Sequence, residues 1–166
     1  EDEVGGLALG DLTGDGRDEV IVADGFYTIP PYVRVYAAER NGMTLRQAVE
    51  LLHNDIPDVV LGDVDRDGDL DVVALNLDIS RNYYGAEKVD ISQLVLMLND
   101  GAGNIHIEQS VELPYGASYM DAVPTMLLAG DLDGDADLDL AIAGASYYEQ
   151  TPPAFQVIEN QNSGES

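Results

Sequence analysis

The sequence predicts an all-β fold made of three copies of one antiparallel unit. Two observations carry this prediction. An acidic loop occurs three times in the same sequence context, and each copy continues into apolar, β-branched runs that end in turn residues. The first aspartates of the loops, Asp11, Asp63 and Asp131, are separated by 52 and then 68 residues. Internal repeats of this size indicate an array of similar supersecondary units.

The composition is that of a folded domain and excludes some partners. The chain has 166 residues, of which 45% are hydrophobic, enough for one domain with a core. Seven Lys and Arg face 32 Asp and Glu, so the net charge is −25. Nucleic acids and anionic membranes select basic surfaces, so we expect neither nucleic-acid binding nor membrane insertion. Cysteine is absent, so no disulfide framework is expected.

Four strands are predicted in each unit. The first precedes the acidic loop and the second follows it directly. The third ends in turn residues, at 33–36, 94–98 and 155–158. The fourth has the pattern Gln-x-Val-Glu-Leu, at 47–51 and 109–113, and the third unit stops before reaching it, in the polar tail 162–166.

The fourth strand of the first unit is ambiguous when it is taken alone. Apolar residues from Leu45 to Ile56 recur at helical spacing, which favours an amphipathic helix. The matching segment of the second unit runs into Pro114 and Gly116, which would end a helix at once. We therefore predict a strand at 44–51.

Four antiparallel strands per repeat of roughly 50 residues are the pattern of β-propeller blades. The repeats are predicted at approximately 5–56, 57–123 and 124–166 of a single domain 1–166, with the last repeat lacking its fourth strand. Closed propellers typically contain about 4–8 blades. About three blades therefore form an incomplete ring or part of a larger propeller or assembly.

The second acidic loop, from Asp63 to Asp71, has the chemistry of a metal site. Carboxylates occupy its positions 1, 3, 5 and 9, and Gly68 at position 6 permits a sharp turn. Hard oxygen donors at this spacing suit Ca²⁺, which takes six to eight oxygens at about 2.3–2.6 Å. Without a cation, two carboxylates about 4 Å apart repel by roughly 4 kcal/mol at an effective dielectric near 20. We expect up to three Ca²⁺ ions, one for each loop.

The helix-loop-helix calcium hand is the main alternative for these loops. That motif requires a bidentate Glu at position 12 and flanking helices. Position 12 is Val22, Ala74 and Ile142 in the three copies, and β-forming residues follow. The sequence therefore excludes the hand and its dockerin relatives.

The three copies resemble the FG-GAP or VCBS repeats of integrin α-subunit propellers and many bacterial surface proteins. The shared marks are the Gly-Asp that opens each loop, the pattern Asp-x-Asp-x-Asp-Gly-x-x-Asp, and the apolar strand after it. Residues 143–145, Ala-Gly-Ala, resemble the end of that repeat, and residues 98–104 resemble the turn between its outer strands. The resemblance implies a calcium-binding propeller in an extracellular or cell-surface protein that serves adhesion or assembly.

In a propeller loop of this kind, the calcium ligands would be the side chains at positions 1, 3, 5 and 9 and the main-chain carbonyl of position 7. In this chain these positions are Asp11, Thr13, Asp15, Arg17 and Glu19; Asp63, Asp65, Asp67, Asp69 and Asp71; and Asp131, Asp133, Asp135, Asp137 and Asp139.

Two of the loops depart from the pattern. The first has Thr13 at position 3 and Glu19 at position 9, and the third has Ala136 where Gly is expected, which is strained if that residue adopts a positive φ. We predict that Ca²⁺ affinity decreases from the second loop to the third and then to the first. The expected role of each ion is structural, holding the turn between the first two strands.

Aromatic residues gather in the loops that join the second and third strands, on the rim opposite the acidic loops. The candidate partner-binding residues are Tyr27, Tyr83, Tyr84, Tyr147 and Tyr148. Two interpretations stay open for them: recognition of a protein or glycan, or packing over neighbouring blades.

Catalysis has little support in the sequence. His53 and His106 lie far apart in the repeat, and no nucleophile elbow, phosphate loop or HExxH motif occurs. We therefore expect a protein that is not an enzyme.

Two alternatives to an adhesion or assembly module remain. The chain is a fragment of a carbohydrate-active enzyme similar to polysaccharide lyases, or it is a structural subunit whose open edges join further blades from a parent chain or from other copies.

Overall fold

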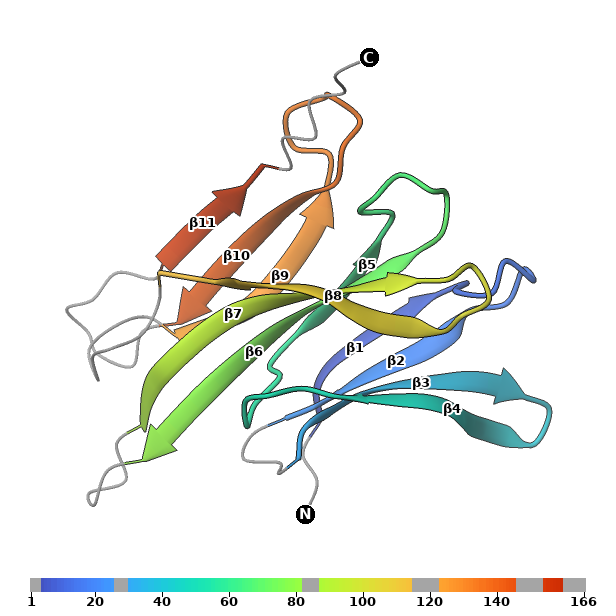
Figure 1. Cartoon of the computed structure of the whole chain (residues 1–166), viewed down its shortest axis with the longest axis horizontal. Helices are drawn as coiled ribbons and strands as arrows, with labels where there is room; N and C mark the ends of the chain where they lie inside the picture. Colours follow the sequence, from blue (N-terminus) through green and yellow to red (C-terminus); the bar gives the residue numbers. More distant parts are fainter. Residues whose placement is uncertain (1–3, 26–29, 82–86, 115–122, 146–153, 160–166) are drawn as a thin grey trace.

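The computed structural model describes residues 4–25, 30–81, 87–114, 123–145 and 154–159 (Figure 1). These ranges contain strands and no helix. The strands are β1 (Val4–Gly10), β2 (Glu19–Asp24), β3 (Tyr32–Glu39), β4 (Gly42–Glu50), β5 (Val59–Gly62), β6 (Asp71–Arg81), β7 (Glu87–Asn99), β8 (Ile105–Glu112), β9 (Val123–Gly130), β10 (Asp139–Ala145) and β11 (Ala154–Ile158). The segment with helical spacing is therefore a strand, β4, as predicted.

The strands form three antiparallel sheets in which neighbours in sequence are neighbours in space. We name them unit 1 (β1–β4), unit 2 (β5–β8) and unit 3 (β9–β11). The predicted all-β architecture is confirmed, with four strands in units 1 and 2 and three among the described residues of unit 3. The described strands do not close a ring, so the number of blades stays a prediction.

The described part of the chain contains no helix that is long and apolar enough to cross a membrane.

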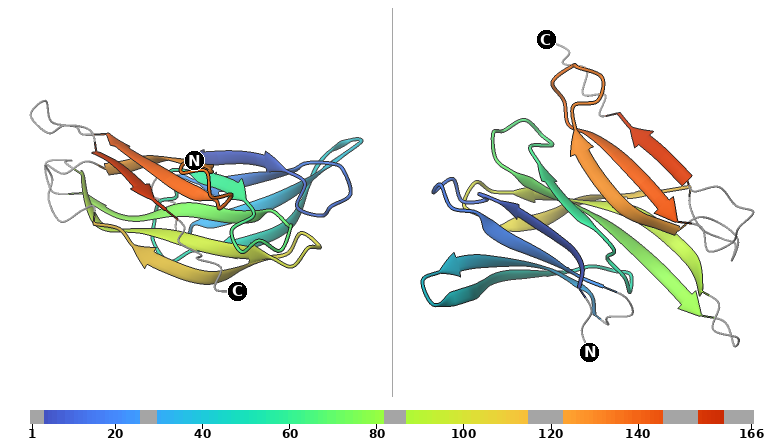
Figure 2. Two further views of the ribbon diagram at one scale, coloured as in Figure 1. Left: turned by 90° about the horizontal axis from the view of Figure 1, so that it is seen from above. Right: turned by 180° about the vertical axis from the view of Figure 1, so that it is seen from behind.

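Unit 2 lies between the other two units, and the three sheets stand side by side (Figures 1 and 2). Strand β6 explains the position of unit 2. Its Val72 and Ala74 belong to the apolar cluster shared with unit 1, whereas Val73 and Leu75 belong to the cluster shared with unit 3. Because alternate residues of a strand point to opposite faces, a sheet buried on both faces needs a continuous apolar strand.

A glycine sets the close approach of each unit to the next. A Cβ atom on Gly10 would lie 2.7 Å from a side-chain carbon of Leu61 and 2.8 Å from one of Leu70. A Cβ atom on Gly62 would lie 2.2 Å from a side-chain carbon of Leu138, which holds the same loop position in unit 3 as Leu70 in unit 2. The glycine that opens the first and the second loop therefore makes room for a leucine of the following unit.

Candidate metal centre

The three acidic loops join the first and second strands of their units and share one hydrogen-bond pattern. The carboxylate at position 1 accepts the N–H of position 6 in every loop. The donor to acceptor distances are 2.7 Å for Gly16 to Asp11, 3.1 Å for Gly68 to Asp63 and 3.2 Å for Ala136 to Asp131. The position 5 carboxylate likewise accepts the N–H of position 7, at 3.0, 2.9 and 2.9 Å in the first, second and third loops.

The carboxylate at position 9 connects the end of each loop to its beginning by accepting the N–H of position 2. Its partners are Leu12 for Glu19 at 3.0 Å, Val64 for Asp71 at 2.9 Å, and Leu132 for Asp139 at 2.8 Å. The longer side chain of Glu19 thus reaches the same amide that the aspartates reach in the other loops. All three loops fold alike although their sequences differ.

Positions 4 and 6 adopt positive φ angles in every loop. The pairs are Gly14 (69°) and Gly16 (84°), Arg66 (66°) and Gly68 (97°), and Gly134 (87°) and Ala136 (70°). The strain expected at Ala136 is therefore present. Arg66 is a second strained position that the sequence analysis missed, because the pattern leaves position 4 open. A non-glycine residue in this conformation costs roughly 1–2 kcal/mol.

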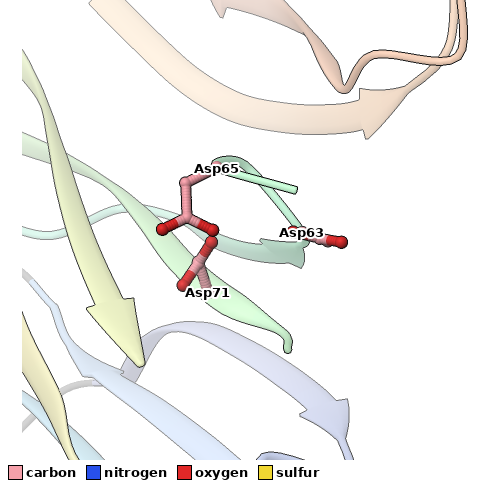
Figure 3. Close-up of side chains that lie close together, drawn as sticks. All are labelled: Asp63, Asp65 and Asp71. Atoms are coloured by element: carbon pink, nitrogen blue, oxygen red, sulfur yellow. The ribbon is translucent and has the colours of Figure 1, made fainter. Parts of the chain in front are cut away.

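Two of the loops bring three carboxylates together. Oxygen atoms of Asp63, Asp65 and Asp71 all lie within 4.8 Å of one another (Figure 3). The third loop meets the same limit with the carboxylate oxygens of Asp131, Asp133 and Asp139. Among the residues that the structure describes, the first loop forms no such group of three acidic side chains.

The carboxylates of the second loop fit a divalent cation. The Oδ1 atom of Asp63 is buried and has no hydrogen-bond partner among the described residues. Burial raises the pKa of Asp71, and the negative charges of Asp65 and Asp67 raise it further. A buried oxygen without a partner beside two more carboxylates is costly, and oxygen-rich acidic sites are those that Ca²⁺ selects.

The first loop differs because its arginine pairs with a carboxylate of the same loop. The guanidinium of Arg17 pairs with the carboxylate of Asp15. This hydrogen bond is the largest cause that lowers the pKa of Asp15. In the third loop the pKa of Asp133 is raised instead. The Asp135 N–H acts to lower it, but burial and the charges of Asp135 and Asp139 outweigh that hydrogen bond.

The remaining predicted positions lie around these centres. Asp67 and Asp135 at position 5 are exposed. At position 7, the Asp69 carboxylate lies close to Gly101 of the β7–β8 turn. The side chain of Asp137 is buried and pairs with Arg66 of the second loop, so it links the loops of units 2 and 3. His53 is half-buried and His106 is exposed, and neither belongs to an acidic group of the described residues.

Asn99 supports the site in a way that the sequence analysis missed. Its side-chain amide donates to the carbonyls of Leu12 at 2.8 Å and Leu70 at 3.1 Å, and its Oδ1 accepts the N–H of Gly103 at 3.0 Å. Its main-chain N–H donates to Asp71 at 2.9 Å. Asn99 is buried and joins the acidic loops of units 1 and 2. The sequence indicated only a turn residue, since a contact across 87 positions leaves no local signal.

The predicted aromatic rim lies outside the described residues, as do all five of its candidate residues: Tyr27, Tyr83, Tyr84, Tyr147 and Tyr148. Tyr32, at the start of β3, is described. Its ring lies 5.0 Å from the Arg34 guanidinium carbon, and its hydroxyl donates to Glu50 at 3.4 Å. These contacts position the strand end and leave the role of the rim a prediction.

Each of the three antiparallel units carries one acidic loop between its first two strands, so the described part of the chain is an array of similar all-β modules. A family model described as FG-GAP-like repeat matches residues 5–74, which cover unit 1 and unit 2 as far as the strand after the second acidic loop. This stretch carries FG-GAP-like repeats, and the resemblance found in the sequence is confirmed over these residues. No curated protein matches the chain.

Proposed function

We propose that this chain is a calcium-stabilised β-propeller module of an extracellular or cell-surface protein and serves adhesion or assembly. The proposal rests on two clusters of three carboxylates each. One cluster is Asp63, Asp65 and Asp71 in unit 2, and the other is formed by the equivalent residues of unit 3. The buried Asp63 oxygen without a partner supports a cation at the first of them. The FG-GAP-like repeats support the extracellular location.

In this proposal the carboxylates at positions 1, 3 and 9 would hold the ion, with the position 5 side chain and position 7 carbonyl as further ligands. The ion would neutralise oxygens that are otherwise held together at a cost, and so stabilise the turn between the first two strands. The proposal assigns the loops a structural role and no catalytic one. We retain the expectation that the protein is not an enzyme.

Calcium titration by calorimetry tests the assignment of the loops. We expect Asp65→Asn and Asp133→Asn each to abolish one binding event, with Glu108→Gln as a control that removes the same charge outside the loops. Asp67→Asn should lower the overall affinity more than Asp15→Asn, because Arg17 already compensates Asp15. Equal loss of binding in the Glu108→Gln control would show that only the general negative charge attracts calcium.

Thermal melting with excess chelator tests the structural role. A ligand present at 100 times its dissociation constant stabilises the folded state by about 2.7 kcal/mol. We therefore expect the melting temperature to fall by several degrees when calcium is removed and to recover when it is restored. A melting temperature that chelator leaves unchanged would show that the structural role is wrong.

The adhesive part of the proposal concerns the aromatic rim. Protein or glycan recognition there would place partner binding opposite the acidic loops. We expect Tyr→Ala changes at positions 83, 84, 147 and 148 to abolish binding to the partner found on a glycan array or protein screen. The same changes should leave the melting temperature in place. A lowered melting temperature with binding intact would favour the packing interpretation.

A second candidate function is assembly through the outer sheet faces. Leu7 and Leu9 on unit 1 are 63% and 67% exposed, and Leu128 and Phe155 on unit 3 are 65% and 70% exposed. The two faces differ, so contact between them in neighbouring molecules would be head-to-tail. Light scattering should then show a mass that rises with concentration and falls to the monomer for Leu128→Asp. A monomer at all concentrations would exclude this candidate.

A further inference from the structure

An apolar cavity of about 230 Å³ lies between units 2 and 3. Unit 2 lines it with Val73, Leu94 and Leu96, and unit 3 with Leu140 and Ile158. An apolar cavity of about 150 Å³ is already large enough to hold benzene. This cavity therefore has room for a branched aliphatic side chain.

The interface between units 1 and 2 shows what such a side chain would be. The strand registers match Ile21 and Val35 of unit 1 with Val73 and Leu96 of unit 2, since each pair lies directly opposite on adjacent strands. At the corresponding place, Ile105 packs in one buried cluster with Ile21 and Val35 and is only 1% exposed. The cavity is thus the equivalent of the space that Ile105 fills.

A glutamine occupies the equivalent position at both interfaces. Gln47 lies opposite Val35 on β4, and Gln109 lies opposite Leu96 on β8. The Gln47 amide holds the first residue of β8 by two hydrogen bonds: Nε2 donates to the Ile105 carbonyl at 2.6 Å, and Oε1 accepts the Ile105 N–H at 2.9 Å. Gln109 lines the cavity, and its side-chain amide has no hydrogen bond to any described residue.

Strand β11 offers the backbone edge that such an occupant needs. It pairs with β10 on one side, and within the described ranges no strand pairs with its other side. A free strand edge presents unpaired N–H and C=O groups that an extended peptide can complete. The cavity, the free amide of Gln109 and the edge of β11 together have the features of one binding site.

We propose that this site accepts an extended peptide strand from a partner polypeptide, which pairs with β11 and inserts one branched aliphatic side chain into the cavity. The Gln109 amide would hold the main chain of the inserted residue, as Gln47 holds Ile105. Because Glu159 lines the cavity and the chain carries a net charge of −25, the residues that flank the aliphatic one are neutral or basic. This inference does not depend on calcium binding.

Binding of a synthetic peptide of residues 103–112, which comprises the whole of β8 and the two turn residues before it, tests the proposal by calorimetry. The residues on either side of Ile105 in this peptide, Asn104 and His106, carry no negative charge, as the proposal requires. We expect one peptide to bind per chain and an Ile105→Ala peptide to bind at least tenfold more weakly. Hydrogen exchange at the amides of β11 should slow when the peptide binds.

Three chain variants locate the peptide. Val111 lines the cavity and is 46% exposed, so Val111→Phe should fill the space without unfolding the sheet and abolish binding. Ser110→Phe, its neighbour on the opposite face of β8, should bind as the parent chain does. Gln109→Ala, at an exposed position, should weaken binding about tenfold with an unchanged melting temperature. Failure of the peptide to bind the parent chain, or equal binding to Val111→Phe, would overturn the proposal.

Discussion

The two interfaces between neighbouring units are built from equivalent residues but are completed differently. Between units 1 and 2, Ile105 is buried under Gln47 and Asn99 bridges the two acidic loops. Between units 2 and 3 the corresponding space is a cavity, and the loops are joined by the ion pair of Arg66 and Asp137. This difference indicates that packing against the preceding unit also requires the outermost strand of a unit. The inner strands alone leave a cavity.

The largest expected effect comes from making the first interface resemble the second. Ile105→Ala removes a fully buried side chain and leaves a cavity between units 1 and 2. Comparable substitutions destabilise proteins by about 2–5 kcal/mol, and we expect a value in this range from denaturant unfolding. Ile107→Ala on the same strand, where the side chain is 46% exposed, is the control and should cost much less. Similar losses for both variants would contradict the comparison.

A smaller effect should separate the glycines that open the loops. Gly62→Ala would force its methyl group against Leu138 across the second interface, and overpacking of this kind costs about 1–3 kcal/mol. Gly130 holds the same position in unit 3, and a Cβ atom there would meet nothing within 4 Å. Gly130→Ala should therefore not lower the melting temperature. A loss at Gly130 equal to that at Gly62 would mean that the effect is local to the loop.

The smallest effect concerns the strained positions of the loops at the second interface. Ala136→Gly removes the strain of a positive φ, but Gly also loses more freedom on folding, so we expect a gain of roughly 0.5 kcal/mol. Arg66→Gly relieves the same kind of strain but leaves the buried Asp137 without its cation, so it should lower stability. Parallel thermal melts of the two variants give the comparison. A gain in both would show that the ion pair contributes nothing.

Much of the fold followed from the sequence because its signals are local and repeated. The acidic loops, the apolar runs and the Gln-x-Val-Glu-Leu segments recur in register, and this recurrence identified β4 as a strand despite its helical spacing. The closure of a ring lies beyond such signals, because it depends on contacts between units. The same reason hid the role of Asn99, whose partners are distant in sequence.

The candidate site was predictable as far as side-chain chemistry decides it. The pattern identified the carboxylates that meet in the second and third loops and the strain at Ala136. It did not identify Arg66 as a residue with positive φ or as the partner of Asp137, since position 4 carries no signature and the pair spans two units. It also gave no indication that Arg17 would supply a cation within the first loop.

The two buried faces of β6 have a consequence for how the array can be extended. Val72 and the even-numbered residue after it pack against unit 1, whereas Val73 and the odd-numbered residue after it pack against unit 3. The alternation of side chains along β6 therefore determines which unit lies on which face of the sheet. Loss or gain of one residue within β6 would turn the side chains of the rest of the strand to the opposite faces. Such a chain can change its number of units by copying or deleting a complete repeat, but not by shifting within one.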